Sequence, residues 1–246
     1  MNVSNIDTQM GFTFFIMLTV GYFILSYLIG RPSKQKKSST VSFAINVSYF
    51  LILAISQYLL NLQITAGMCN NTYQYTTAAY VTLVPWVLIF GILNLMILIF
   101  PGWLSPFSNT FGYLITSLFG VKEKIRDVFK NPDETGVTDK ARETINYIYG
   151  NQSLLINEIT MQNINSFLVN MKDLLREGYD ESPDEKTPSK LDKLKDMIYL
   201  KESVAQFMWY ILSGSLVISV ATNSIINSGC NYNESKLQEL SNNLVR

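Results

Sequence analysis

The chain has 246 residues, of which 48% are hydrophobic and only 15% are charged, and its 19 basic and 19 acidic residues cancel formally. This balance indicates neither a nucleic-acid partner nor an acidic one. The absence of histidine excludes a histidine general base, a Ser-His or Cys-His nucleophile pair and a histidine-ligated metal. Of the 38 charges, 29 lie between residues 121 and 202, a split typical of a membrane protein that carries one soluble insert.

Residues 1–100 are predicted to form a three-span membrane region. Crossing about 30 Å of hydrocarbon takes about 20 apolar residues. Four runs without a charged residue are long enough, three of them in this region, and they extend over Gly11 to Gly30, Val41 to Leu60, Ala78 to Phe100 and Ser203 to Ile226. Four such runs favour membrane spans over buried helices of a soluble protein. Residues 203–228 are therefore predicted to form the fourth transmembrane helix.

Basic residues predict the orientation of these spans. The stretch "RPSKQKK" follows the first span directly, and lysines and arginines flank both ends of the segment between the third and fourth spans. Because positive charge stays on the cytoplasmic side, we expect the insert to be cytoplasmic and both the N-terminus and the C-terminus to be non-cytoplasmic.

Residues 101–120 are predicted to form an interfacial amphipathic helix. Ser105 is expected to cap it, Pro106 to occupy its first helical position and Gly120 to follow its end. A helix of 14 residues reaches only about 21 Å, which is shorter than the hydrocarbon thickness. Its apolar face contains Phe107, Phe111, Leu114, Ile115, Leu118 and Phe119, and small or polar residues recur on the other face. A fifth span through Pro101 is the alternative.

Residues 121–202 are predicted to form a soluble helical insert. Its 13 basic and 16 acidic residues argue against nucleic-acid binding. We expect a helix capped by Thr138 and ending at Gly150, a longer one from Ser153 to Gly178, and a last one that continues into the fourth span. The longer helix carries an apolar stripe that either packs within the chain or offers a partner surface, and it includes Leu155, Ile159, Phe167, Met171 and Leu174.

Residues 229–246 are predicted to be a polar C-terminal tail. With four spans, Cys69 and Cys230 fall on the same outer face, each a few residues from a span end. They could therefore form a disulfide, whereas a fifth span would separate them. Two free thiols are the alternative.

The sequence shows no motif for catalysis or for binding a cofactor. There is no phosphate-binding glycine loop, and the four spans hold no Asp, Glu, Lys or Arg that could relay protons. The polar residues Asn46, Gln57, Asn94 and Gln206 are expected to form hydrogen bonds between helices. We therefore expect a protein that is not an enzyme and has no cofactor or metal. A small channel or transporter is the alternative, and a membrane enzyme that uses interfacial carboxylates is the third class considered.

At "FPGWLSPFSNTFGYL" and again at "NQSLLINEIT", the chain resembles uncharacterised multi-pass membrane proteins of the nucleocytoplasmic large DNA viruses. The resemblance implies a structural component of the host-derived membrane inside the virion, beneath an icosahedral capsid. It implies the bilayer and a capsid or other shell protein as partners, and it supplies no catalytic residue. Together with the residue patterns, it predicts an all-α polytopic protein that anchors the membrane against the shell through residues 121–202. A homo-oligomer is open as a further partner arrangement.

Overall fold

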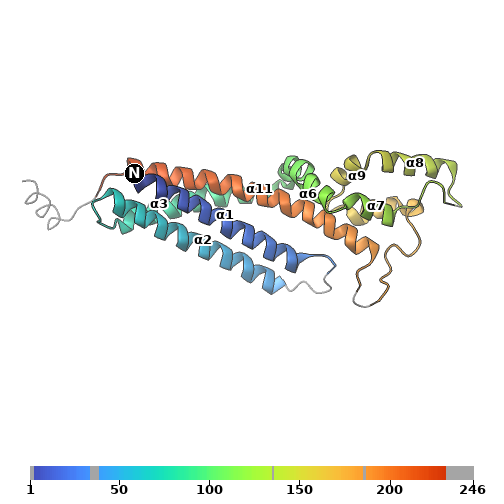
Figure 1. The fold of residues 1–246 in the computed structure, drawn as a ribbon, viewed down its shortest axis with the longest axis horizontal. Helices are drawn as coiled ribbons and strands as arrows, with labels where there is room; N and C mark the ends of the chain where they lie inside the picture. The colour runs from blue at the N-terminus through green and yellow to red at the C-terminus, as the bar shows by residue number, and fades with distance from the viewer. Residues whose placement is uncertain (1–2, 34–38, 135, 185–186, 231–246) are drawn as a thin grey trace, which may run out of the picture. The chain divides into compact units, whose positions relative to one another are not determined.

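The computed structural model describes residues 3–33, 39–134, 136–184 and 187–230, without the side chains of residues 3–8 and 39. The described chain is all-α, and no β-strand occurs among these residues (Figure 1). Among the described residues, four helical stretches are long and apolar enough to cross a membrane, which confirms the predicted polytopic fold class. They are α1 (Val3–Gly30), α2 (Ser39–Met68), the consecutive helices α3 (Tyr75–Pro85), η1 (Trp86–Phe90) and α4 (Gly91–Ile99), and α11 (Lys190–Asn227).

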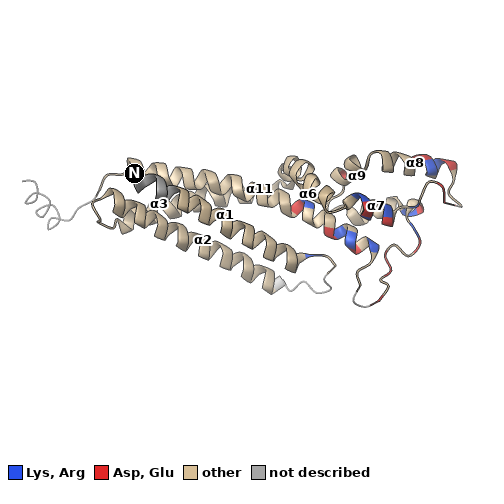
Figure 2. Ribbon diagram, viewed as in Figure 1, with Lys and Arg blue, Asp and Glu red and all other residues tan. Residues whose placement is uncertain are grey.

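Large apolar side chains cover the outside of these four stretches. Met17, Phe43 and Leu98 are 68%, 69% and 79% exposed, an arrangement that suits hydrocarbon and not water. The charged residues gather elsewhere, on helices such as α7 and α8 and on the first part of α11 (Figure 2). All seven charges of α11 lie in Lys190–Glu202. The part of α11 from Ser203 onward therefore carries no charge.

The chain divides into two compact units. The first, called the bundle unit here, comprises Met1–Gly21, Ile45–Ile99 and Tyr210–Arg246. The second, called the insert unit, comprises Tyr22–Ala44 and Phe100–Trp209. The unit boundaries fall inside α1, α2 and α11, so these three helices contribute residues to both units.

Neighbouring helices of the bundle unit run antiparallel. Gln57 Nε2 of α2 donates a hydrogen bond to the carbonyl oxygen of Gly11 in α1 (3.2 Å), while the hydroxyls of Thr19 and Tyr49 lie 3.0 Å apart. Gly11, earlier in α1, thus pairs with the later residue Gln57 of α2, and Thr19, later in α1, pairs with the earlier residue Tyr49. The same reversal relates the stretch α3–η1 to α11, since Val81 and Ile225 belong to one buried cluster and the rings of Phe90 and Tyr210 stack.

Cys69 and Cys230 are joined by a disulfide, with their Cα atoms 5.5 Å apart. Cys69 directly follows the end of α2, and Cys230 lies three residues beyond the end of α11. The sequence left open a disulfide or two free thiols, and the structure contains the disulfide. The last residues of α2 and α11 consequently lie at the same end of the bundle unit. Most of the predicted polar tail, from residue 231 onward, lies outside the described residues.

Residues 101–118 form a helical run built from four short pieces. They are η2 (Pro101–Leu104), α5 (Ser105–Phe107), η3 (Ser108–Gly112) and α6 (Tyr113–Leu118). The prediction that Ser105 caps this helix is wrong. Pro101 already begins the run, so Ser105 is itself a helical residue, and Leu104 stands at the cap position of α5. The predicted end is confirmed, because Gly120 has a φ of +79°, a conformation that favours glycine.

The rest of the insert unit contains α7 (Val121–Val128), α8 (Asp139–Gly150), α9 (Gln152–Glu158), α10 (Ile164–Asn170) and the 3₁₀ turn η4 (Lys172–Leu174). Helix α8 begins and ends where the sequence predicts, since the Thr138 hydroxyl accepts from the Ala141 amide at 3.3 Å and the helix stops at Gly150. The single helix predicted from Ser153 to Gly178 is wrong. Three shorter elements occupy that stretch.

Local hydrogen bonds around Thr160 and Asn163 explain the break between α9 and α10. The Thr160 amide donates to Asn163 Oδ1 (2.7 Å), and the Asn163 amide donates to the Thr160 hydroxyl (3.2 Å). Asn163 Nδ2 also donates to the Glu158 carbonyl (2.8 Å). Such side-chain bonds offer the backbone an alternative to the helical ladder. The chain accordingly leaves the helix at Ile159, which is extended.

The apolar stripe that the sequence offered as a partner surface is instead buried in, or packed against, the core of the insert unit. Ile159 and Leu174 are 1% and 8% exposed, so a partner cannot reach them. Leu155, Phe167 and Met171 are partly buried and pack against the same core. The stripe therefore packs within the chain. Fully buried members of this core are Val121, Ile125, Val128, Phe129, Ile145 and Ile198.

Candidate functional site: the α11 clamp and an arginine pocket

Two consecutive residues of α11 hold the α9–α10 connection by hydrogen bonds to its main chain. The Lys201 ammonium, whose side chain is fully buried, donates to the carbonyl oxygens of Ile156 (2.6 Å) and Ile159 (2.7 Å). Glu202 Oε1 accepts from the Met161 amide (2.9 Å). We call this arrangement the α11 clamp. A buried ammonium is tolerable only with such acceptors, and here it satisfies carbonyls that the end of α9 leaves unpaired.

Gly112 packs closely against the backbone and side chain of Lys201. A Cβ atom built on Gly112 would lie 2.5 Å from the Lys201 carbonyl oxygen and 2.9 Å from Lys201 Cγ. Only a glycine allows the helical run 101–118 to approach α11 so closely at this point. In Figure 1 the turns of this run, drawn in bright green, are seen nearly end-on, whereas α11 extends across the view. The run therefore crosses the Lys190–Trp209 part of α11.

A second set of contacts ties the α1–α2 connection to α11 within the insert unit. Asp196, only 8% exposed, accepts from the Ser33 amide (3.0 Å) and the Ser33 hydroxyl (2.5 Å). The Tyr27 and Tyr199 rings stack with centroids 5.9 Å apart. Gly30 lies against the Tyr199 hydroxyl. Lys34, Lys36 and Lys37, which follow in the sequence, lie outside the described residues.

The run 101–118 has the two faces that the sequence predicts. Phe111, Leu114 and Leu118 are 45%, 57% and 76% exposed. Phe107 is partly buried because its ring packs edge-on against Trp209, with centroids 6.2 Å apart. The opposite face consists of buried small residues, Ser108, Gly112 and Thr116. That face contacts protein rather than water, which the sequence analysis did not anticipate.

Polar side chains inside the bundle unit are engaged in hydrogen bonds between helices or with their own helix. Gln57 bonds across to α1 as predicted. Asn94 does not bond to another helix: its Nδ2 donates to the Phe90 carbonyl in the same helical stretch (2.8 Å). Sequence reasoning missed the pair Asn61–Thr82, joined at 2.8 Å. Asn61 was placed beyond the end of the second span, whereas α2 continues to Met68.

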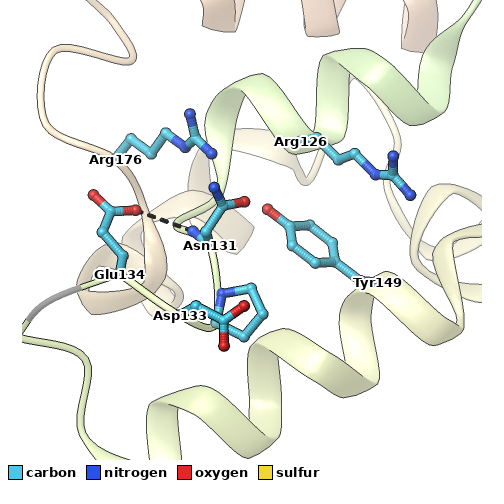
Figure 3. A pocket seen from close by; sticks show the side chains of 7 residues that line it. Arg126, Asn131, Asp133, Glu134, Tyr149 and Arg176 are labelled. Carbon is cyan, nitrogen blue, oxygen red and sulfur yellow. Dashed lines mark hydrogen bonds between the residues drawn. The ribbon is translucent and has the colours of Figure 1, made fainter.

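An open pocket of about 570 Å³ lies between α7, α8 and the segments that follow α7 and η4 (Figure 3). Two arginines, two acidic residues and a tyrosine dominate its lining, which consists of Arg126, Asn131, Pro132, Asp133, Glu134, Tyr149 and Arg176. No sequence motif signals this pocket, because its residues come from three separate stretches of the chain. We call it the arginine pocket.

The Tyr149 hydroxyl points into the middle of the arginine pocket (Figure 3). It donates to the carbonyl oxygens of Lys130 (2.9 Å) and Phe129 (3.1 Å). Burial raises the pKa of this phenol above its usual value of 10.0, while Arg176 and Arg126 act to lower it and Glu134 to raise it. The hydroxyl thus stays protonated at neutral pH.

The described residues contain no group of three or more His, Cys, Asp or Glu side chains that could hold a metal ion. No protein-family model, curated protein or solved structure matches the chain. The resemblance to viral membrane proteins therefore stays a prediction that rests on the residues quoted for it.

Proposed function

We propose that this protein is a membrane anchor that holds a small helical unit at the bilayer surface for a structural role. One observation carries the proposal: α11 is at once a membrane span and part of the core of the insert unit. Leu194 and Ile198 of α11 are buried in that core, and the fully buried Lys201 clamps the α9–α10 connection. The insert unit is thus built around the extension of a transmembrane helix rather than joined to it by a flexible linker.

The exposed face of the run 101–118 supports the same function. Its large apolar side chains would lie in the bilayer interface, with Trp103, 48% exposed, at the depth of the headgroups. Its small face is packed on protein, including α11 at Gly112. An interfacial helix packed in this way would set the height of the insert unit above the lipid. If residues 101–120 crossed the membrane as a fifth span, Cys69 and Cys230 would lie on opposite sides of the bilayer. The disulfide between them argues against that alternative.

The orientation follows from the charges and the disulfide. The basic residues of the insert unit favour the cytoplasmic side. The Cys69–Cys230 disulfide favours the opposite, oxidising side. A membrane-impermeant lysine reagent should modify Lys122 and Lys190 when it is added to the cytoplasmic side of sealed vesicles. Modification only from the other side would reverse the orientation.

The resemblance to proteins of large DNA viruses supports a finer version of the proposal. In that version the membrane is the internal membrane of a virion and the partner of the insert unit is a capsid or other shell protein. The rival channel or transporter would need polar side chains free to line a path. The hydrogen bonds of Gln57, Asn61 and Thr19 use such groups to join helices instead.

Crosslinking mass spectrometry on intact particles or native membranes tests the anchor function. The exposed lysines of the insert unit, such as Lys122, Lys172 and Lys190, report what lies next to it. Links from them to another protein, and to a shell protein in the finer version, are the expected result. Lys201 is fully buried and serves as an internal negative control. Complete lysine coverage with links only within the chain and its copies would contradict the anchor function.

A further inference from the structure

The chain contains five Asn-X-Ser/Thr triplets, the acceptor pattern of N-linked glycosylation. They begin at Asn2, Asn46, Asn70, Asn151 and Asn233. Asn2 and Asn233 lie outside the described residues. The other three can be compared in the structure, and each lies in a different environment.

Asn70 lies in the turn between α2 and α3. Its side chain is exposed and that of Thr72, the third residue of the triplet, is partly exposed. Neither side chain forms a hydrogen bond with any residue that the structure describes. The Asn70 amide and the Thr72 hydroxyl are therefore both available to a modifying enzyme.

The backbone of this turn accounts for its two asparagines but not for its threonine. Asn70 and Asn71 have φ values of +49° and +63°, a left-handed conformation that asparagine adopts more readily than most residues. The Asn71 amide donates to the Ala66 carbonyl (2.9 Å), and the Thr72 amide donates to the Cys69 carbonyl (3.0 Å), which ends α2. The Thr72 hydroxyl takes no part in these bonds, so the turn does not require it.

The disulfide places this turn on the oxidising side of the membrane. Asn70 directly follows Cys69, which is joined to Cys230, and the lumen in which disulfides form is a compartment of secreted, glycosylated proteins. In Figure 1 the α2–α3 connection lies at the same end of the bundle unit as the last turn of α11. The predicted second span ends at Leu60 and α2 continues to Met68, so the turn stands about 12 Å beyond that end.

The other two triplets of the described chain lack these features. Asn46 lies inside α2, within a candidate membrane span, where a soluble acceptor site cannot form. Asn151 lies between α8 and α9 in the insert unit, and its Nδ2 atom already donates to the Tyr147 carbonyl (3.0 Å). In the proposed orientation Asn151 also faces the cytoplasm, away from the disulfide.

We propose that Asn70 is an N-glycosylation site whose sugar donor is a lipid-linked oligosaccharide diphosphate. In the transfer, the Asn70 Nδ2 atom attacks C1 of the first sugar and forms the N-glycosidic bond. The bond between C1 and the diphosphate oxygen breaks, the lipid diphosphate leaves, and Nδ2 gives one proton to a base of the transferase. The step needs no oxidant or reductant. The inference goes beyond the anchor function and rests on the orientation proposed with it.

Cell-free synthesis of the full chain with microsomes, which supply the transferase and the donor, tests the site. Attached glycans are counted as steps in gel mobility that a peptide-N-glycosidase removes. Thr72→Ala destroys the triplet and keeps both left-handed asparagines, so it should carry one glycan fewer than the wild-type chain. Thr72→Ser preserves the triplet and should keep that glycan. Asn151→Gln should carry as many glycans as the wild-type chain.

Three outcomes would overturn the proposal. Equal numbers of glycans on Thr72→Ala and the wild-type chain would show that Asn70 is not modified. Equal losses in Thr72→Ala and Thr72→Ser would trace the change to insertion or folding rather than to the triplet. A glycan lost in Asn151→Gln would place the insert unit on the glycosylated side and overturn the orientation as well. An unmodified Asn70 in vesicles whose Lys122 reacts from the cytoplasmic side would refute this site alone and leave the anchor function standing.

Discussion

The bundle unit and the insert unit are both built from helices, but they distribute polarity in opposite ways. In the bundle unit, buried Thr19 and Gln57 form hydrogen bonds inside while large apolar side chains such as Leu98 face outward. In the insert unit, Ile125 and Ile145 are fully buried, and most charged side chains face outward, with Lys201 and Asp196 as buried exceptions. Each unit therefore matches a different solvent, lipid for the first and water for the second.

Helix α11 contains both arrangements in one element. Its first part gives Leu194 and Ile198 to the insert core, and its last part gives Val217 and Ile225 to the bundle interior. Lys201 stands where the apolar span meets the charged extension. The core of the insert unit therefore includes residues of a helix that also spans the bundle unit. Substitutions in each unit can test this dependence.

The largest expected effect is at the α11 clamp. Lys201→Met keeps the length of the side chain but leaves the Ile156 and Ile159 carbonyls without their donor. We expect a loss of about 3 kcal/mol in the unfolding free energy of the insert unit. Chemical unfolding of the full chain in micelles, followed by circular dichroism, measures it. Lys190→Met, at an exposed position of the same helix, should cost less than about 0.5 kcal/mol.

The matching test in the bundle unit is Gly214→Val. A side chain at Gly214 would run into the ring of Phe15, which is fully buried. Overpacking of this kind costs about 2 kcal/mol, measurable by denaturation with sodium dodecyl sulfate. Gly21→Val is the control, because nothing lies within 4 Å of a Cβ atom built there. Equal stability of the two variants would show that α1 and α11 do not pack as described.

A smaller effect is expected at the exposed cap of α8. Thr138→Ala removes the acceptor of the Ala141 amide and should destabilise the insert unit by about 1 kcal/mol. Thr144→Ala, in the same helix, removes a hydroxyl that bonds only to its own helix and should cost less. Thermal unfolding of both variants decides the order. The reverse order would show that α8 does not begin at Asp139.

The smallest effect is expected for a hydrogen bond inside the bundle. Thr19→Val removes the contact with the Tyr49 hydroxyl and should cost about 0.6 kcal/mol, because polar groups in a membrane find other partners when one is removed. Thr13→Val, exposed on the same helix, is the control. A loss larger than that of Thr138→Ala would show that the bundle finds no other partner for the Tyr49 hydroxyl.

Much of the fold was predictable because it depends on composition and local signals. Four uncharged runs predicted the spans, and Thr138 with Gly150 predicted α8. The α9–α10 break was not predictable from apolar periodicity, because it depends on Thr160, Asn163 and the distant Lys201. In the sequence, Lys201 is one of several lysines before the fourth span and indicates only its orientation. The tertiary structure shows that its side chain is buried.

The same limit applies to the candidate sites. The cysteine pair could be expected from topology, because both residues lie near span ends on one face. The arginine pocket could not, since Arg126, Tyr149 and Arg176 come from separate stretches of the chain that only the tertiary structure brings together. The direction in which the small face of the run 101–118 points likewise depends on its close approach to α11 at Gly112.

Hydrogen exchange of the full chain in nanodiscs tests most directly whether the insert unit is built around α11. We expect the amides of residues 190–202 to be protected as strongly as those of the insert core at Ile125 and Ile145. We also expect Lys201→Met to raise exchange at residues 156–161 and 190–202 together, with residues 210–227 unchanged. Fast exchange of residues 190–202 beside a protected insert core would show instead that the insert unit folds without the membrane helix, and would contradict the account.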